Sequence, residues 1–336
     1  MSNLFLVKSP LQLLNAIEAS NKFPSDNNIL IVRFTSNDRT NTQIKQLLSF
    51  KEWENILQIK YSGFPINFIK EYLLLRKLKR SLNTFDYIFI GDYRLLNFII
   101  FPMNLKHRKA YLLDDGTSTF TIQELYLKDQ KEFSEKPIMS FSKKIIAKYC
   151  FGFRTQLEER IHLFTCYRIK PYLGQEIVTN DYSYTKTYIN ARLELKIDKD
   201  KVYYIGAKYV ESNLMKENDY FVVIKKIKEK YKHKKFIYIP HRGESKLKLK
   251  EIEKMGIDII YLSNIVEIEL LYTAYIPETI CGLTSSALIN IPKIYPKLKI
   301  IAYKVREELF LPSYRQSARS VYGRFKDEEG LIISKI

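Results

Sequence analysis

The sequence is poor in cysteine and has no long apolar run. Its three cysteines, Cys150, Cys166 and Cys281, lie far apart and show no metal-ligand spacing, so we predict reduced thiols, buried beside apolar runs, in a cytoplasmic protein. Apolar runs such as LNFIIFPMNL at 96–105 are far shorter than the ~20 residues of a membrane span. The opening MSNLFLVKSP lacks a basic region followed by a long apolar stretch, so no secretory signal is expected.

Two glycine-rich signatures are also missing. The chain contains no G-x-G-x-x-G and no P-loop sequence, which argues against dinucleotide-binding and NTPase functions. Internal repeats and low-complexity segments are missing as well. What remains is an ordinary globular composition with 46% hydrophobic and 27% charged residues, which excludes disorder. A length of 336 residues suggests two domains.

Acidic residues are few relative to basic ones. The chain has 55 Lys and Arg against 37 Asp and Glu, a net charge of +18. Nucleic acid, an anionic membrane surface, or an acidic sugar nucleotide and its acceptor could all use this charge. The alternative is that a lysine-rich chain from an AT-rich genome carries solvated helix faces. Nucleic acid is disfavoured because the excess is mostly Lys, and the 25 tyrosines are scattered rather than interleaved with Arg.

Short apolar runs alternate with helical patterns along the chain. We predict strands at 4–7, 29–34, 87–92 and 109–116 and, after a restart near residue 195, at 202–207, 258–262 and 298–303. In the same half, 236–243 is predicted as a strand that runs into a loop and 279–290 as a strand that passes into a helix. Ser9 and Pro10 favour a helix start after the first strand. The pattern predicts an α/β protein with two doubly wound, Rossmann-like domains over 1–195 and 196–305. The segment 306–336 shows no strand pattern and is expected to be helical and to pack back toward the first domain.

Chemistry-bearing residues follow the predicted strands, where ligands of such folds bind. Asp114 and Asp115 precede Gly116 at one strand end. They are either a helix cap with a turn, or a general base whose basicity is raised by the neighbouring like charge. His241 and Arg242 follow a strand in IYIPHRGES. Such a pair suits an anionic leaving group, although a lone histidine is commonly a neutral core residue.

A third stretch, CGLTSSALIN, passes from a strand into a helix. Its Gly282, Thr284, Ser285 and Ser286 could bind an anion at the helix N-terminus, or merely cap the helix. Glu267 opens the preceding helix, where it could accept ribose hydroxyls or simply favour the helix dipole.

The order of these motifs resembles that of bacterial sialyltransferases of the lipooligosaccharide and polysialic-acid type. Those families carry an acidic-acidic-Gly motif, a His-Pro motif and a Ser-Ser/Thr motif in this order, and LFLVKSPLQLLNAIEA at 4–19 is similar to their first strand and helix. The resemblance spans roughly residues 4–305 and departs from the pattern at one point. His241 is preceded by Pro240 and followed by Arg242, rather than by Pro.

The resemblance implies a GT-B scaffold, two Rossmann-like domains facing a central cleft. It implies direct displacement, with inversion, from CMP-sialic acid or a related CMP-nonulosonate to a surface-polysaccharide or lipooligosaccharide glycan. A donor with one phosphate implies no metal. Asp115 or Asp114 would be the base, with Glu211, after YYIGAKYV, as the alternative.

By the same resemblance His241 would assist the departing phosphate together with Arg242. Ser285 and Ser286 would hold that phosphate, and Glu267 would bind the ribose. Another GT-B transferase, with a CMP-Kdo or UDP-sugar donor, stays open as an alternative. We expect a cytoplasmic enzyme in peripheral contact with an anionic membrane, through the basic segments 68–82 and 225–254. The acceptor, the linkage and the oligomeric state are left open.

Overall fold

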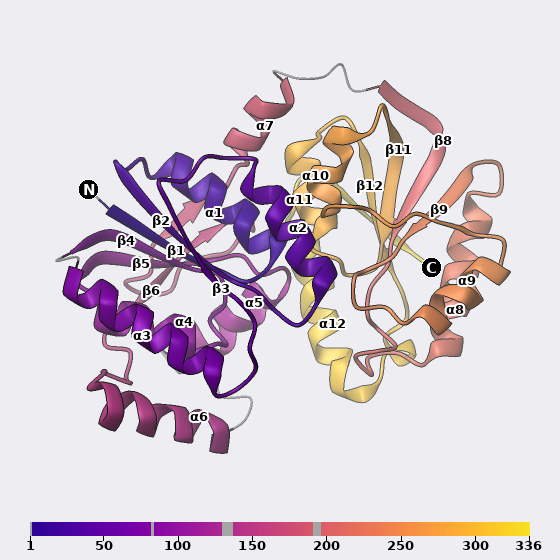
Figure 1. Ribbon diagram of the computed structural model, residues 1–336. Helices are drawn as coiled ribbons and strands as arrows, with labels where there is room; N and C mark the ends of the chain where they lie inside the picture. Colours follow the sequence, from indigo (N-terminus) through magenta and orange to yellow (C-terminus); the bar gives the residue numbers. More distant parts are fainter. Residues whose placement is uncertain (1, 82–83, 130–136, 191–195) are drawn as a thin grey trace. The chain divides into compact units, whose positions relative to one another are not determined.

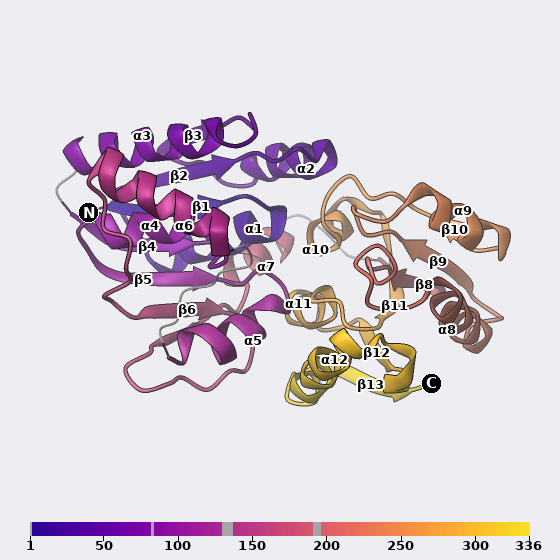
Figure 2. The ribbon, with the colours of Figure 1, turned by 90° about the horizontal axis from the view of Figure 1, so that it is seen from below.

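The computed structural model describes residues 2–81, 84–129, 137–190 and 196–336. They form two compact units, Met1–Asn180 and Asp181–Ile336, each built on one sheet (Figures 1 and 2). The first sheet has seven strands and the second has six, and all strand pairs are parallel. The units divide just before α7 (Ser183–Asn190), whereas the sequence pattern placed the join near residue 195.

The first unit is a doubly wound sheet. Its strands are β1 (Ser2–Val7), β2 (Asn27–Arg33), β3 (Asn55–Ile59), β4 (Phe85–Ile90), β5 (His107–Leu113), β6 (Ile161–Thr165) and β7 (Ile177–Thr179). They lie in the order β3-β2-β1-β4-β5-β6-β7. The order reverses between β1 and β4, and this switch point is where doubly wound sheets bind ligands at the strand carboxyl ends. Residues that follow β1, β4 and β5 are therefore the ones to inspect.

Local sequence accounts for the helices that connect these strands. They are α1 (Pro10–Lys22), α2 (Asp38–Leu48), α3 (Ile66–Ser81), α4 (Leu96–Asn104), α5 (Ser118–Ile122), η1 (Gln123–Leu127), α6 (Pro137–Ile145) and η2 (Ile146–Cys150). The predicted helix start after the first strand is confirmed, because the Ser9 hydroxyl accepts a bond from the Gln12 backbone N–H at 3.3 Å and Pro10 follows it. The strands that they cover are apolar, and Phe5 of β1 stacks on Phe89 of β4 at 4.7 Å between ring centroids.

The second unit repeats the architecture with strands in the order β10-β9-β8-β11-β12-β13. Their bounds are β8 (Lys196–Ile205), β9 (Lys235–Ile239), β10 (Asp258–Ile259), β11 (Tyr275–Gly282), β12 (Lys299–Lys304) and β13 (Leu331–Lys335). The helices are α7, α8 (Glu217–Lys230), α9 (Lys246–Lys254), α10 (Val266–Glu269), η3 (Leu270–Tyr272), α11 (Ala287–Ile294), η4 (Glu307–Leu309) and α12 (Pro312–Phe325). The order reverses between β8 and β11, so the loops after these strands form the second switch point.

Two expectations need correction. The segment after residue 305 is not purely helical, because β13 pairs in parallel with β12, with Ile300 opposite Leu331. It is a five-residue edge strand with partly exposed side chains, which gives it a weak sequence signal. Cys150 is exposed rather than buried, whereas Cys166 and Cys281 are buried as expected. None of the helices in the described ranges is long and apolar enough to cross a membrane.

Candidate functional site

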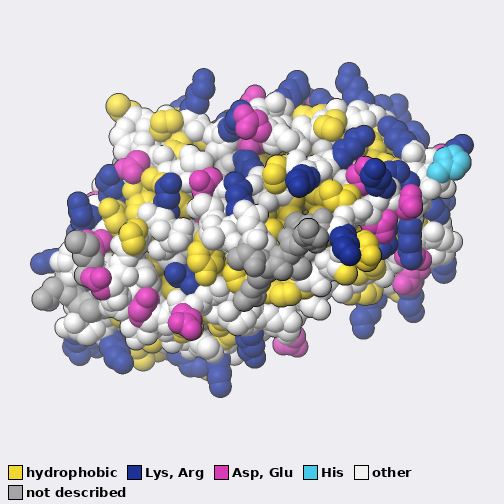
Figure 3. Space-filling model, turned by 90° about the horizontal axis from the view of Figure 1, so that it is seen from above, with side chains coloured by type: hydrophobic (Ala, Val, Ile, Leu, Met, Phe, Trp, Pro, Cys, Tyr) yellow, Lys and Arg dark blue, Asp and Glu magenta, His cyan; other side chains and the backbone are white. Residues whose placement is uncertain are grey.

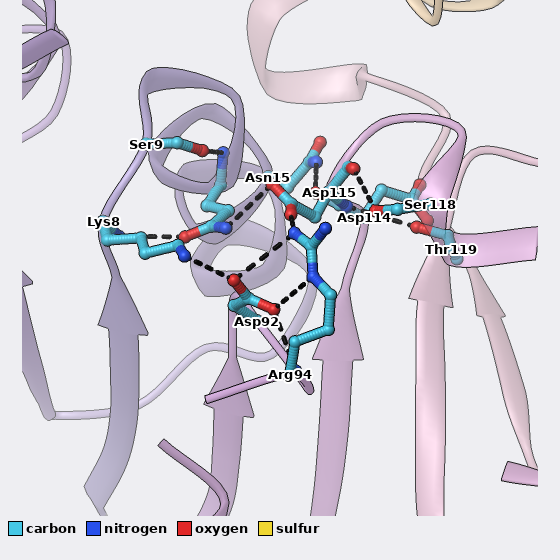
Figure 4. Close-up of polar contacts among 10 residues, drawn as sticks. Lys8, Ser9, Asn15, Asp92, Arg94, Asp114, Asp115, Ser118 and Thr119 are labelled. Atoms are coloured by element: carbon cyan, nitrogen blue, oxygen red, sulfur yellow. Dashed lines mark hydrogen bonds and ion pairs between the residues drawn. The ribbon is translucent and has the colours of Figure 1, made fainter. Parts of the chain in front are cut away.

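Polar side chains from three strand ends meet at the switch point of the first unit (Figure 4). Lys8 follows β1 and its Nζ lies 2.5 Å from Oδ2 of Asp92, which follows β4. Arg94 Nε lies 2.9 Å from Asp92 Oδ1, and the same guanidinium also contacts the carboxylate of Asp115, which follows β5. Gln12 of α1 donates to Asp115 Oδ1 at 2.8 Å. Two carboxylates and two cations thus form one connected cluster.

The two carboxylates of this cluster have opposite pKa shifts. Burial and then the negative charge of Asp92 raise the pKa of Asp115, against the opposing effects of Arg94 and Gln12. Burial also acts to raise the pKa of Asp92, but Lys8 and Arg94 together outweigh it and lower that pKa. The Asp115 side chain remains 17% exposed. A reachable carboxylate with a raised pKa beside a second one that stays ionised is an arrangement suited to a general base.

Asp114 has a different role from its neighbour. It is buried, its Oδ2 accepts a hydrogen bond from the Cys166 backbone N–H at 2.8 Å, and its backbone oxygen accepts one from Asn15 Nδ2 at 3.0 Å. Asn15 in turn accepts a bond from Asn180 Nδ2 at 3.0 Å. Asp114 therefore ties β5 to the end of β6 and to α1. A φ of +67° at Gly116 begins the turn away from the strand, a conformation that glycine adopts at low cost.

In the second unit, His241 lies in the loop after β9. The Gly243 backbone N–H donates to His241 Nδ1 at 3.0 Å. Because that nitrogen accepts a hydrogen bond, the neutral imidazole carries its proton on Nε2. The His241 backbone N–H also donates to Glu244 Oε1 at 2.5 Å. Both contacts fix the loop and leave an Nε2–H group as the donor of the ring.

A buried cluster of charged side chains, formed by Lys248, Glu211 and Glu244, packs against this loop. Lys248 Nζ, which is fully buried, lies 2.9 Å from Glu211 Oε2 and 3.0 Å from Glu244 Oε2. Tyr238 OH donates to Glu244 Oε2 at 2.6 Å. Burial raises the pKa of Glu244, whereas for Glu211 the Ser245 backbone N–H and Lys248 outweigh burial and lower its pKa. Glu211 is thus an ion-pair partner whose pKa is held below its ordinary value.

The four small residues at the end of β11 and after it, Gly282, Thr284, Ser285 and Ser286, separate into two pairs. Gly282 packs closely on β8, where a Cβ would lie 3.1 Å from the Ile205 carbonyl oxygen. Thr284 also makes a contact within the second unit, because its backbone N–H donates a hydrogen bond to Tyr209 OH at 2.9 Å. Ser285 and Ser286 are half-buried at the start of α11, and Ser286, at the N-cap position, makes no capping bond from its side chain to any described residue. The Ser285 hydroxyl accepts a long bond from the Ala287 backbone N–H at 3.4 Å, and both hydroxyls lie at a helix N-terminus, which is a favourable position for an anion.

Glu267 lies in α10 and is hydrogen-bonded to α11, the helix that follows these serines. Its Oε1 accepts a bond from Asn290 Nδ2 of α11 at 2.9 Å. Burial raises the pKa of Glu267, while Asn290 and the charge of Arg242 act in the opposite direction. In the second unit, Glu267 therefore lies within electrostatic reach of Arg242 and contacts α11.

The sequence analysis did not identify the residues that contact the candidate site residues and shift their pKa values. They are Lys8, Gln12, Asp92 and Arg94 in the first unit and Glu244 and Lys248 in the second. The only available signal for Lys8 and Asp92 was their position directly after apolar strands. Within the described residues, no group of three or more His, Cys, Asp or Glu could hold a metal ion.

Two doubly wound parallel sheets, each with polar residues at its switch point, define a GT-B-like two-domain protein. Two solved structures share this fold. One is the UDP-GlcNAc 2-epimerase of Methanocaldococcus jannaschii in complex with UDP-GlcNAc and UDP, with 14% identity over 100% of this chain and 89% of that one and a TM-score of 0.52. The other is the Neisseria meningitidis UDP-GlcNAc 2-epimerase bound to UDP-GlcNAc, with 10% identity over 87% and 80% and a TM-score of 0.51.

Residues 3–304 match the alpha-2,8-polysialyltransferase (POLYST) family, and the chain belongs to that family. It is a family of enzymes that transfer sialic acid from CMP-sialic acid to a polysialic acid acceptor. The resemblance seen in the motif order and the expected GT-B fold are thereby confirmed. A comparison with curated proteins finds no match.

Proposed function

We propose that this chain is an inverting transferase in which Asp115 is the general base. The observation that carries the proposal is the cluster at the first switch point, where burial and ionised Asp92 raise the pKa of a reachable carboxylate. In the proposed step, the acceptor hydroxyl oxygen forms a bond to the anomeric carbon of the sialyl group. The bond from that carbon to the phosphate oxygen breaks, its electron pair leaves with CMP, and the hydroxyl proton passes to Asp115.

The second unit supplies the donor side of the proposed reaction. His241 donates a hydrogen bond from Nε2–H to the departing phosphate, and Arg242 adds positive charge. Ser285 and Ser286 bind phosphate oxygens at the start of α11, and Glu267 accepts ribose hydroxyls. This assignment differs from the sequence-based one in that Gly282 and Thr284 shape the site rather than contact the nucleotide. A single phosphate needs no divalent cation to bridge it, so we propose a metal-independent reaction.

We further propose that the acceptor is a sialylated glycan of a surface polysaccharide or lipooligosaccharide. The donor is CMP-sialic acid or a related CMP-nonulosonate. The reaction is proposed to take place on the cytoplasmic side, with the enzyme in peripheral contact with the inner face of the membrane. Family membership supports the donor and the class of acceptor, and the excess of basic residues supports a polyanionic acceptor and an anionic surface.

Three measurements test the proposal. CMP should raise the melting temperature more than UDP or GDP do, because the proposed donor site is built for one phosphate. Transfer from CMP-sialic acid to sialylated oligosaccharides should proceed in the presence of EDTA, and NMR should show that the configuration at the anomeric carbon is inverted. Stabilisation by UDP alone, or retention of configuration, would exclude the mechanism proposed.

A further inference from the structure

Helix α3 of the first unit exposes an apolar and basic face. Ile66, Ile69 and Leu73 are exposed and recur at the spacing of one helical face, with half of the Leu73 side chain (52%) in contact with solvent. The same face continues toward the C-terminal end of the helix as Arg76 and Arg80. An open depression in this part of the surface is lined by Leu73, Arg76, Lys77, Arg80 and Ser81.

The continuous helical segment α6–η2 lies beside α3 (Figures 1 and 2) and exposes a similar face. Phe141 and Tyr149 are 66% and 76% exposed, and Ile145 lies between them at 41%, each four residues from the next. The two helices are linked by Lys143, whose Nζ lies 5.7 Å from the ring centroid of Phe64, the residue just before the first turn of α3. We name the exposed faces of α3 and α6–η2 the α3–α6 surface.

Among the residues that the structure describes on these helices, no exposed acid interrupts this surface. Among the described residues of α3, α6 and η2 the only carboxylate is Glu71, which is buried and lies 2.5 Å from Arg33 Nε. The exposed charges on these helices include Lys70, Lys77 and Lys148. The surface is therefore apolar and cationic at once, which is the composition of helices that lie in the headgroup region of a bilayer.

The second basic segment, 225–254, differs because acids lie among its basic residues. Four glutamates lie among its twelve Lys and Arg residues, and some of its lysines pair with acids, as in Lys254–Glu251 at 2.7 Å and Lys235–Asp258 at 3.1 Å. Lys248 does not reach the surface at all. On the one face of the molecule that Figure 3 draws, Lys and Arg side chains lie among Asp and Glu. This segment is typical of solvated helix faces.

We propose that the α3–α6 surface docks on an anionic lipid bilayer. The apolar side chains would insert at the boundary between headgroups and acyl chains, and the basic side chains would contact anionic headgroups. A hydrated polysaccharide would pair with the charges but would leave the apolar side chains in water. A second copy of the chain would bring two cationic surfaces together. The inference rests on the proposed membrane contact and not on the proposed transfer reaction.

Vesicle sedimentation of the full chain tests this surface through its charges. Each basic residue near an anionic bilayer changes the partition coefficient about five-fold. The triple variant Arg76→Gln/Lys77→Gln/Arg80→Gln should therefore bind phosphatidylglycerol-containing vesicles about 100-fold more weakly than the unaltered protein. The apolar contribution is tested by Ile69→Ser/Leu73→Ser, which should lower binding about ten-fold and abolish the part that survives high salt.

Matched controls come from the second unit, where Lys225→Gln/Lys226→Gln/Lys232→Gln removes the same charge from exposed positions. Val222→Ser/Leu247→Ser removes exposed apolar side chains there. Both control variants should bind vesicles within about three-fold of the unaltered protein. An equal loss in controls and test variants would overturn the proposal, as would unaltered protein that does not bind anionic vesicles.

Further measurements distinguish bilayer docking from the binding of other partners to this surface, and from the transfer reaction. If the surface binds a polyanionic glycan instead, the α3 triple variant loses binding to heparin but keeps binding to vesicles. If it binds a second copy, sedimentation velocity shows an oligomer that the α3 variants dissociate. Either result refutes bilayer docking. Transfer to a soluble acceptor and the melting temperature should be unchanged in all variants, so a failure of docking is distinguishable from a failure of the proposed reaction.

Discussion

Replacing the two adjacent aspartates one at a time separates catalysis from structure. Asp115→Asn removes the proposed base but keeps a side chain of the same shape, and the loss of a general base costs roughly 10²- to 10⁴-fold in turnover. The fall should appear in kcat, with the KM for CMP-sialic acid changed little, because the proposed donor contacts come from other residues. Stability should change by less than about 1 kcal/mol, since the Arg94–Asp115 pair is partly solvated.

Asp114→Asn should have the opposite profile. The buried carboxylate accepts a hydrogen bond from the Cys166 backbone N–H at 2.8 Å, and Asn can replace this charged acceptor only with a neutral one. A charged hydrogen bond is worth about 1.5–3 kcal/mol and a neutral one about 1, so the first unit should lose about 1–2 kcal/mol. For a unit of this size the loss lowers the melting temperature by roughly 2–8 °C. Turnover should fall less than in Asp115→Asn.

The assay measures kcat, KM and thermal unfolding for both variants, alongside Glu211→Gln. Glu211 is paired with fully buried Lys248 at 2.9 Å, so its amide variant should destabilise the second unit. A near-normal kcat for Asp115→Asn would refute the assignment of the base. If Glu211→Gln alone abolished transfer at unchanged stability, the base would belong to the second unit.

Three further changes probe the surroundings of these side chains. Asp92→Asn removes a negative charge that raises the pKa of Asp115. Without it the base stays deprotonated to lower pH, so the acid limb of the kcat/KM profile should shift to lower pH. A shift to higher pH would contradict the reasoning. Glu244→Gln weakens the 2.5 Å bond from the His241 backbone N–H and should lower kcat about ten-fold at nearly constant donor KM, whereas a rise in KM alone would indicate a binding role. Gly91→Ala would place a Cβ 2.9 Å from a backbone oxygen of β1; urea denaturation should show a loss of at least about 2 kcal/mol, and a neutral result would mean that this contact relaxes.

Local signals in the sequence were sufficient for the architecture. Ser9 and Pro10 mark the start of α1, and apolar runs mark most strands, because caps and periodicity act over a few neighbouring residues. The edge strand β13 is short, and none of its five side chains is fully buried, so its pattern does not alternate between buried and exposed positions. In α9 the run KLKLK looks solvent-exposed, yet Lys248 is buried because acids from two loops surround it.

The different contacts of Asp114 and Asp115 could not be predicted from the sequence, because the two adjacent residues are identical. They depend on which carboxylate meets the Cys166 N–H and which meets Arg94, and both partners come from other strands. The pKa of Asp115 likewise depends on Asp92, which lies more than twenty residues away along the chain. Sequence adjacency suggested that Asp114 would be the tuning charge, whereas the structure assigns that effect first to burial and then to Asp92.

The bond between Asn180 and Asn15 has a consequence for the order of folding. It joins the last residue of the first unit to its first helix, across 165 positions of the chain, and Asn15 also holds the backbone of Asp114. Parallel strands with such distant contacts close large loops and fold slowly. During synthesis, the Asn180 amide becomes available only after residue 180 has left the ribosome, so we expect a shorter nascent chain to hold Asn15 and the acidic pair without this contact.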